Sequence, residues 1–407
     1  MTLTDFKNTH FLLLLLTMTT CFCCKSQTKN KLTGKLIPEN IVLGADQVNE
    51  YLPLIKNKKV AIVANQTSII NFKIDSSAHI IDYLHLKNID IKYVFAPEHG
   101  FRGKADAGEL IKDGIDNKTA IPIISLYGKN KKPSIQQLDG VEIIIFDIQD
   151  VGARFYTYIS TLHHIMEACA ETNIPLIVLD RPNPNGNYID GPILEKEHIS
   201  FVGMHPVPVV HGMTIGEYAQ MINGEGWLAK EVKCELSIVK MKNYTHQTTY
   251  SLPIKPSPNL PNDTSINLYP SLCFFEGTYL SAGRGTEMQF QLFGAPNLSP
   301  ELFPFTFTPR SNEGAKTPKF KDELCYGKDL RNTEKLTKLN LEWLINVYNK
   351  TDKNKNFFSP FFTKLAGTKK LQEQIEKGYT YGEIRKTWLK DLNDYDELRE
   401  KYLLYCR

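Results

Sequence analysis

The sequence is poor in cysteine outside its first two dozen residues. It has eight cysteines, and those after residue 24 are widely spaced, with no CxxC pair among them. A zinc ribbon or a dense disulfide framework requires closely spaced cysteines, so both are disfavoured. We expect buried free thiols and at most one or two disulfides.

An excess of charge of either sign is also missing. The chain has 48 Lys and Arg residues against 45 Asp and Glu residues, which gives a formal net charge of +3. A protein that binds nucleic acid mainly by electrostatics normally carries a concentrated basic face. We therefore expect no nucleic-acid partner.

Several nucleotide and hydrolase motifs are absent. No GxGxxG follows the first predicted strand, and neither GxxxxGK[ST], GxSxG nor HExxH occurs. Dinucleotide, P-loop and standard serine-hydrolase chemistry therefore lack their usual backbone or nucleophile. His163 and His164 lie next to each other in a predicted helix, where adjacent side chains point to different faces. We expect no metal site and no cofactor.

The sequence has no apolar run long enough to span a bilayer comfortably. The uncharged run at residues 11–24 has 14 residues, against about 20 for a membrane span. Such a run is typical of an export signal, and its end in Cys21, Cys23 and Cys24 resembles a bacterial lipoprotein signal. We predict a signal peptide at residues 1–24, of lipoprotein type or plainly cleaved. The protein is then expected to be periplasmic, with membrane attachment through an N-terminal lipid in the first case.

Strand-like and helix-like patterns alternate over the first half of the chain. Short apolar runs predict strands at 60–64, 89–96, 121–126, 141–148, 176–179 and 236–241, and helical spacing predicts helices at 76–87, 157–172 and 214–221. This alternation predicts an α/β domain with a mostly parallel sheet over residues 25–245. A proline-rich segment at residues 252–261 follows. After it, the pattern predicts a smaller α+β C-terminal domain over residues 246–407, with short strands at 288–293 and 302–308 and helices at 333–349 and 380–404.

Polar clusters follow the predicted strands at their carboxyl ends, where open parallel sheets bind ligands. If the fold prediction holds, these clusters meet in one crevice that is rich in carboxylates, arginines and amides. The candidate residues in them are Asn65, Glu98, His99, Arg102, Asp147, Gln149, Asp150, Arg154, Tyr156, Asp180, Arg181 and Asn183.

An exported protein with a carboxylate-rich crevice and no nucleotide motif suits glycoside hydrolysis, in which a carboxylic acid protonates the leaving oxygen and a second group acts as base or nucleophile. Glu98 is the best acid/base candidate, because it follows a buried strand, His99 can tune its protonation and Gly100 permits a sharp turn. The second carboxylate stays open among Asp106, Glu109, Asp147, Asp150 and Asp180.

Several long, ordered motifs carry a family resemblance. The segments at residues 95–103, 147–158, 179–184, 191–192, 210–217, 256–259, 275–278 and 281–286 resemble those of the NamZ (YbbC) family. The resemblance implies an exo-β-N-acetylmuramidase that releases N-acetylmuramic acid from the non-reducing ends of peptidoglycan fragments. It also implies a Rossmann-like catalytic domain, a smaller C-terminal domain and a cleft between them. The Glu-His-Gly motif of the family falls on Glu98, His99 and Gly100.

This substrate carries a lactyl carboxylate, which calls for an arginine able to bind it in a two-pronged way. Arg284, between two glycines, is the best candidate, with Arg102, Arg154 and Arg181 as rivals. The remaining candidates are Asn183 and Asn259 for the acetamido group, Tyr156 and Tyr158 for stacking, Thr286 for substrate binding and Glu276 for catalysis from the second domain.

Two other functions remain open from the sequence. One is a periplasmic sugar-binding lipoprotein without catalysis, and the other is a metal-dependent cell-wall amidase or esterase. The choice among a retaining, an inverting and a substrate-assisted mechanism is also left open, as is the oligomeric state.

Overall fold

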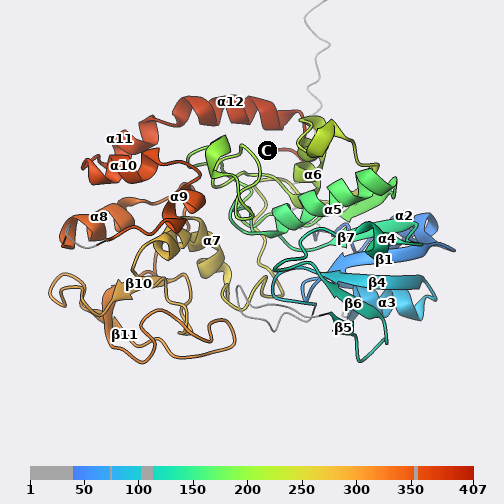
Figure 1. Ribbon diagram of the computed structural model, residues 1–407, viewed down its shortest axis with the longest axis horizontal. Helices are drawn as coiled ribbons and strands as arrows, with labels where there is room; N and C mark the ends of the chain where they lie inside the picture. The colour runs from blue at the N-terminus through green and yellow to red at the C-terminus, as the bar shows by residue number, and fades with distance from the viewer. Residues whose placement is uncertain (1–39, 74–75, 102–112, 353–355) are drawn as a thin grey trace, which may run out of the picture. The chain divides into compact units, whose positions relative to one another are not determined.

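A seven-stranded, mostly parallel sheet forms the framework of the first part of the chain (Figure 1). The computed structural model describes residues 40–73, 76–101, 113–352 and 356–407. The strand order is β5-β6-β4-β1-β7-β8-β9, and all neighbours are parallel except β5 and β6. The strands are β1 Lys59–Ala64, β4 Asp90–Ala96, β5 Gly114–Ile115, β6 Pro122–Ser125, β7 Ile143–Asp147, β8 Leu176–Leu179 and β9 Leu236–Val239. The predicted α/β class is confirmed.

Helices cover both faces of this sheet, which explains why its central strands are apolar throughout. All five residues of β7 and all four of β8 are buried. One face packs on α2 (Val48–Ile55) and α3 (Ile80–Leu86), and the other packs on α5 (Tyr158–Thr172) and α6 (Ile215–Gly224). A strand buried on both faces must be a continuous apolar run rather than an alternating one.

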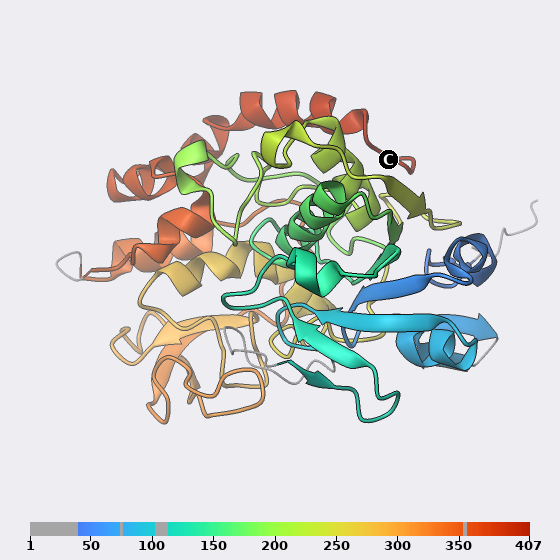
Figure 2. The same ribbon diagram turned by 45° about the vertical axis from the view of Figure 1, so that its right-hand side comes forward.

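A smaller, second part follows and carries a three-stranded antiparallel sheet, in the order β10-β12-β11 (Figure 2). Its α+β character was expected from the sequence. Its elements are α7 Asp263–Leu272, β10 Leu292–Ala295, β11 Phe305–Phe307, β12 Cys325–Asp329, α8 Glu342–Lys350, α9 Phe361–Ala366, α10 Lys370–Glu376, α11 Tyr381–Lys386 and α12 Leu389–Glu400.

Four sequence predictions need correction at the level of single elements. The strand predicted at 288–293 is β10 (Leu292–Ala295), which begins four residues later. The helix predicted at 76–87 is a strand, β3 (Ser76–His79), followed by α3, because β3 pairs in a hairpin with β2 (Ile69–Lys73). The helix predicted at 380–404 is two helices, since α11 ends before residue 388 and α12 begins after it. The helix predicted at 333–349 begins later, at Glu342.

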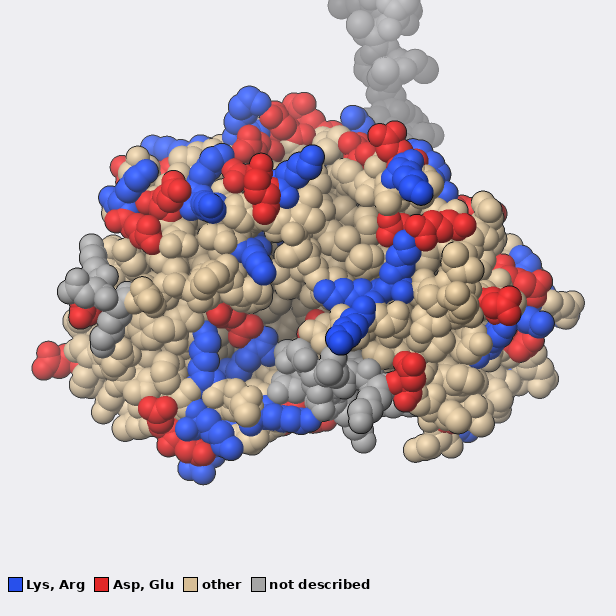
Figure 3. Space-filling model, viewed as in Figure 1, with Lys and Arg blue, Asp and Glu red and all other residues tan. Residues whose placement is uncertain are grey.

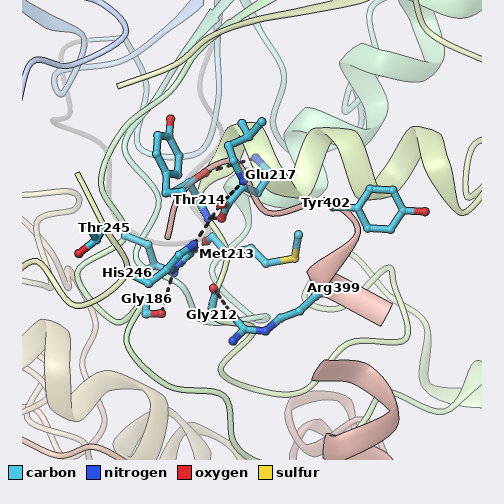
Figure 4. Close-up of polar contacts among 12 residues, drawn as sticks. Gly186, Gly212, Met213, Thr214, Glu217, Thr245, His246, Arg399 and Tyr402 are labelled. Atoms are coloured by element: carbon cyan, nitrogen blue, oxygen red, sulfur yellow. Dashed lines mark hydrogen bonds and ion pairs between the residues drawn. The ribbon is translucent and has the colours of Figure 1, made fainter. Parts of the chain in front are cut away.

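Capping boxes begin α6, at Thr214 with Glu217, and α11, at Thr380 with Glu383. Glu217 has further partners in the core (Figure 4). The His246 ring lies 3.0 Å from Glu217 Oε1 through Nε2 and 3.2 Å from the Gly186 carbonyl through Nδ1.

The C-terminal tail returns to the first part of the chain. The Leu404 amide donates to Glu217 Oε1, and the Tyr405 hydroxyl donates to Asp180 Oδ2 at 2.6 Å. The described cysteines are all free, and among the described residues no helix is both long and apolar enough to cross a membrane.

Candidate active site

A pocket lies at the carboxyl ends of β4, β6 and β7 and is closed by segments of the second part of the chain. Figure 3 shows that this face is hollowed near its centre and that side chains of both charges border the hollow. The lining includes seven of the candidate residues. These are Glu98, His99, Tyr156, Tyr158, Asn259, Glu276 and Arg284.

Glu98 enters the pocket from a tight turn after β4. The Thr157 hydroxyl, at the start of α5, donates to Glu98 Oε2 at 2.6 Å and so fixes the direction of the carboxyl group. His99 has a φ of 69° and Gly100 a φ of 77°, and the Gly100 amide closes the turn onto the Pro97 carbonyl. A positive φ at a buried, non-glycine residue is strained, and such strain is concentrated at functional sites.

Two tyrosines form a buried wall of the pocket. The Tyr156 hydroxyl donates to the Pro256 carbonyl at 2.8 Å, and the Tyr158 hydroxyl accepts from the side-chain amide of Asn65 at 2.9 Å. The two rings meet edge to face, with centroids 4.8 Å apart. Burial raises the pKa of both hydroxyls well above the ordinary value, so they stay protonated donors. They hold the proline-rich segment against the sheet.

Asn259 presents an acceptor at this wall. Its side-chain amide donates to the Gly314 carbonyl at 2.7 Å. Its Oδ1 is buried and has no hydrogen-bond partner among the described residues. A buried acceptor without a partner costs free energy, which a donor on a bound ligand would recover.

Glu276 and Arg284 form a two-pronged ion pair in the same pocket. Arg284 Nε lies 2.6 Å from Glu276 Oε1, and Nη2 lies 2.8 Å from Oε2. Burial acts to raise the pKa of Glu276, but the Arg284 guanidinium outweighs it and lowers this pKa, so Glu276 stays ionised. Gly283, at a φ of 83°, permits the turn that presents Arg284, because a Cβ there would lie 2.7 Å from the Met288 carbonyl oxygen.

The pairing changes how Arg284 can act. Both prongs predicted for the lactyl carboxylate are already bound to Glu276. Arg284 Nη1 makes no hydrogen bond within the described part of the chain and is the donor left for a ligand. A second cavity shares the same ion pair and adds Lys319 to its lining.

Other candidates lie outside the pocket lining, in the interior of the first domain. Arg181 and Asp147 form a buried ion pair, with Nε 2.6 Å from Oδ1 and Nη2 2.9 Å from Oδ2. Gln149 donates to the Pro182 carbonyl at 2.6 Å. Arg181 and Gln149 line a separate, smaller cavity that also includes Tyr250.

Arg154 is fully buried and makes no contact with the pocket space. Its Nη1 donates to the carbonyls of Pro192 and Val207, and its Nη2 donates to those of Leu365 and Ala366. Burial lowers the pKa of Arg154 to about 9. Since Leu365 lines the pocket, Arg154 positions one wall of it from behind.

The remaining candidates have local roles. Asp150 accepts from the Gly152 amide at 2.7 Å, and Asn183 donates to the Met213 carbonyl at 2.8 Å. Asp180 accepts from Thr214 and Tyr405, Asn65 accepts from Thr67, and Thr286 donates to the Gly283 carbonyl. Arg102, Asp106 and Glu109 lie outside the described residues.

Sequence reasoning missed several apolar and aromatic residues of the lining. Phe201 follows no strand, and Tyr269 and Phe290 come from α7 and from the loop before β10. No local pattern marks these residues, because only the tertiary fold brings them to the pocket. Thr157 lies within the motif at residues 147–158 and is the first residue of a predicted helix, and this position was the signal that could have identified it.

The pocket lies at the carboxyl ends of the strands of an α/β sheet, carries carboxylates and is closed by a smaller second domain. These features define a protein with a binding site for a polar ligand. The family models of the exo-β-N-acetylmuramidase NamZ match this chain, the N-terminal model at residues 60–264 and the C-terminal model at residues 267–405. The chain belongs to this family of glycosidases.

Relatives of known name and structure agree with this assignment. The peptidoglycan β-N-acetylmuramidase NamZ of Bacillus subtilis is 39% identical over 377 residues, which cover 88% of this chain and 89% of that protein. Two crystal structures of DUF1343 family proteins from Bacteroides fragilis match with TM-scores of 0.82 and 0.73, at 44% and 30% identity. Each match covers 90% of this chain and 99% of the other.

Proposed function

We propose that this protein is an exo-acting β-N-acetylmuramidase, which releases N-acetylmuramic acid from the non-reducing ends of peptidoglycan fragments. The identity to the Bacillus subtilis enzyme, over most of both chains, carries the proposal. The pocket supports it, because a carboxyl group from the sheet and an ionised carboxylate from the second domain face one space. Glycoside hydrolysis requires such groups beside the scissile bond.

Glu98 is proposed as the general acid/base. Its carboxyl group is held by Thr157, at the end of a buried strand and in a strained turn, so its position is fixed before the substrate binds. Glu276 is less suited to donate a proton, because Arg284 keeps it ionised. An ionised carboxylate instead stabilises positive charge that develops on the sugar ring in the transition state.

Two groups are proposed to recognise the sugar. Arg284 Nη1 is the donor for the lactyl carboxylate, so this contact has one prong where the sequence predicted two. Asn259 Oδ1 is the acceptor for the acetamido N–H, because it is buried and has no partner among the described residues. The pocket would thereby select an N-acetylated, anionic sugar over a neutral one.

The test is incubation with the disaccharide N-acetylmuramyl-β-1,4-N-acetylglucosamine, followed by the masses of the products. The two monosaccharides are expected from the unchanged protein. Glu98→Gln should keep the melting temperature and lose turnover by a factor of about a thousand or more, because the proton donor is removed. Glu301→Gln makes the same chemical change at an exposed site and should keep full activity. Near-normal turnover in Glu98→Gln would contradict the assignment of Glu98 as the general acid/base.

Export and lipidation are proposed from the leader alone, which lies outside the described residues. Labelling cells with a radioactive fatty acid and fractionating them tests the proposal. The protein should carry the label in the membrane fraction, and replacing Cys21, Cys23 and Cys24 one at a time with Ala should identify the modified residue. An unlabelled protein in the soluble periplasmic fraction would instead indicate a plainly cleaved signal peptide.

A further inference from the structure

Three possible metal ligands converge on one side of α5, outside the pocket lining. His163, His164 and Glu167 each offer one ligand atom, and these atoms lie within 4.8 Å of one another. Residues three and four positions apart are neighbours on a helix surface, so Glu167 lies beside both histidines. Although adjacent side chains on a helix point to different faces, the two imidazole rings lie close to each other, with centroids 5.5 Å apart.

We propose that His163, His164 and Glu167 bind a Zn²⁺ ion. Two imidazoles and one carboxylate, with a fourth position open to water, form a known donor set for this ion. With bonds of about 2.0–2.2 Å, tetrahedral coordination places the ligand atoms roughly 3.3–3.5 Å apart. The ligand atoms now lie within 4.8 Å of one another, so binding would require only small side-chain adjustments to reach this spacing.

Hydrogen bonds to neighbouring residues already orient two of the three proposed ligands, His163 and Glu167. His163 Nδ1 lies 2.9 Å from His205 Nε2, and His205 Nδ1 lies 3.0 Å from the Tyr218 hydroxyl, which leaves His163 Nε2 for an ion. Glu167 Oε1 accepts from the Ala229 amide at 3.2 Å. A hydrogen bond to the second nitrogen of a ligating histidine is the usual way in which proteins fix its ring.

The third proposed ligand, His164, has one ring nitrogen without a hydrogen-bond partner among the described residues. His164 Nδ1 is buried and makes no hydrogen bond with any part of the chain that the structure describes. The ring stacks on Phe201, with centroids 6.1 Å apart and an interplanar angle of 12°. Phe201 also lines the pocket that contains Glu98, so an ion on His164 would fix the position of a pocket wall.

Lys132 is the competitor for this site. Its ammonium group lies 3.1 Å from Glu167 Oε2 and 2.8 Å from Glu171 Oε1. The Lys132 side chain is 31% exposed and Glu171 42% exposed, so both can adjust. Zn²⁺ binding would take Glu167 and leave Lys132 paired with Glu171, which reduces the affinity for the ion without preventing its binding.

Two measurements test this proposal on the full-length, tag-free protein with Cys21, Cys23 and Cys24 replaced by Ser, because clustered thiolates would bind these ions themselves. They are calorimetric titration with Zn²⁺ and absorption spectra with Co²⁺ as a visible probe. One equivalent of Zn²⁺ should bind, and Co²⁺ should give the visible bands of a tetrahedral site. His164→Ala and Glu167→Gln should weaken binding by more than a hundredfold, and His205→Asn by about ten- to a hundredfold. Lys132→Met should strengthen it, because the competing charge is removed.

The control is His85→Ala, which removes an exposed histidine from α3 and should leave binding unchanged. Circular dichroism melting curves establish that each variant is folded. The proposal is overturned if the protein binds no Zn²⁺ at micromolar concentration, or if folded His164→Ala and Glu167→Gln both bind it as tightly as the unchanged protein. Equal affinity for Mg²⁺ would also overturn it, since this ion prefers oxygen ligands.

Discussion

At the scale of single residues, the pocket depends on side chains that touch the functional groups rather than on those groups alone. Thr157 is the clearest case, because its hydroxyl donates to Glu98 at 2.6 Å. A typical side-chain hydrogen bond contributes about 0.5–1.5 kcal/mol. Thr157→Val keeps the shape of the side chain and removes the bond, so kcat should fall roughly two- to tenfold.

Steady-state kinetics on the disaccharide check this prediction. Thr157→Ser keeps the hydroxyl group and should retain most of the activity, which separates the hydrogen bond from general packing. An unchanged kcat in a folded Thr157→Val variant would show that Glu98 does not need this partner.

At the scale of elements, α9 depends on Arg154. The helix is only six residues long, and its last two carbonyls accept hydrogen bonds from Arg154 Nη2. Arg154→Met removes the charge and takes the Arg154 donor from four buried carbonyls, of which only that of Val207 keeps another donor among the described residues, the Leu194 amide. We expect a loss of about 3–5 kcal/mol in the free energy of unfolding, as when one partner of a buried polar network is removed.

Urea denaturation measures this loss. KM should rise as well, because Leu365 and Phe361 of α9 line the pocket. Arg331→Met removes an exposed arginine and should change stability by less than about 0.5 kcal/mol. A stability change at Arg154 as small as that at Arg331 would contradict the assigned role.

Elements also show how far the sequence predicts this structure. The central strands β1, β4, β7 and β8 were predicted, because a strand buried on both faces leaves a continuous apolar run. The helix α7 was not predicted: it directly follows the proline-rich segment and contains Pro270, and both features oppose helix in a local reading. The β2–β3 hairpin was also missed, since pairing between segments decides its structure.

The same limit applies to the site. Glu98, His99 and Tyr156 could be found because each lies in the polar segment that follows a strand, and strand ends converge in a parallel sheet. The ion pair of Glu276 with Arg284 could not, because it depends on the fold of a loop. Arg154 and Asp180 are polar residues in the expected place, but their side chains point into the protein, and the sequence does not show that direction.

At the scale of the whole molecule, Asp180 links the sheet to the end of the chain. Burial raises the pKa of Asp180 from its ordinary 3.8 to about 6. The folded protein then keeps a proton that the unfolded chain releases between about pH 4 and pH 6. The contribution of Asp180 to stability therefore falls as the pH rises through this window, by on the order of 1–3 kcal/mol.

Asp180→Asn removes this titration. The unchanged protein should lose stability between pH 4.5 and pH 7.5 through Asp180, and the variant should not. The free energy of unfolding of the variant minus that of the unchanged protein should therefore be higher at pH 7.5 than at pH 4.5, by on the order of 1–3 kcal/mol. Urea midpoints at the two pH values measure it. Asp90→Asn, at an exposed position, should show no such change, and a flat difference for Asp180→Asn would contradict the prediction.

The tail contacts at Asp180 and Glu217 also fix an order of events during biosynthesis. Tyr405 and Leu404 complete the hydrogen bonds of two carboxylates buried in the first domain. These residues are synthesised after every strand of the first domain, so the first domain cannot reach its final state until the chain has been made through Tyr405. The first domain therefore completes its buried hydrogen bonds only after the second domain has been synthesised.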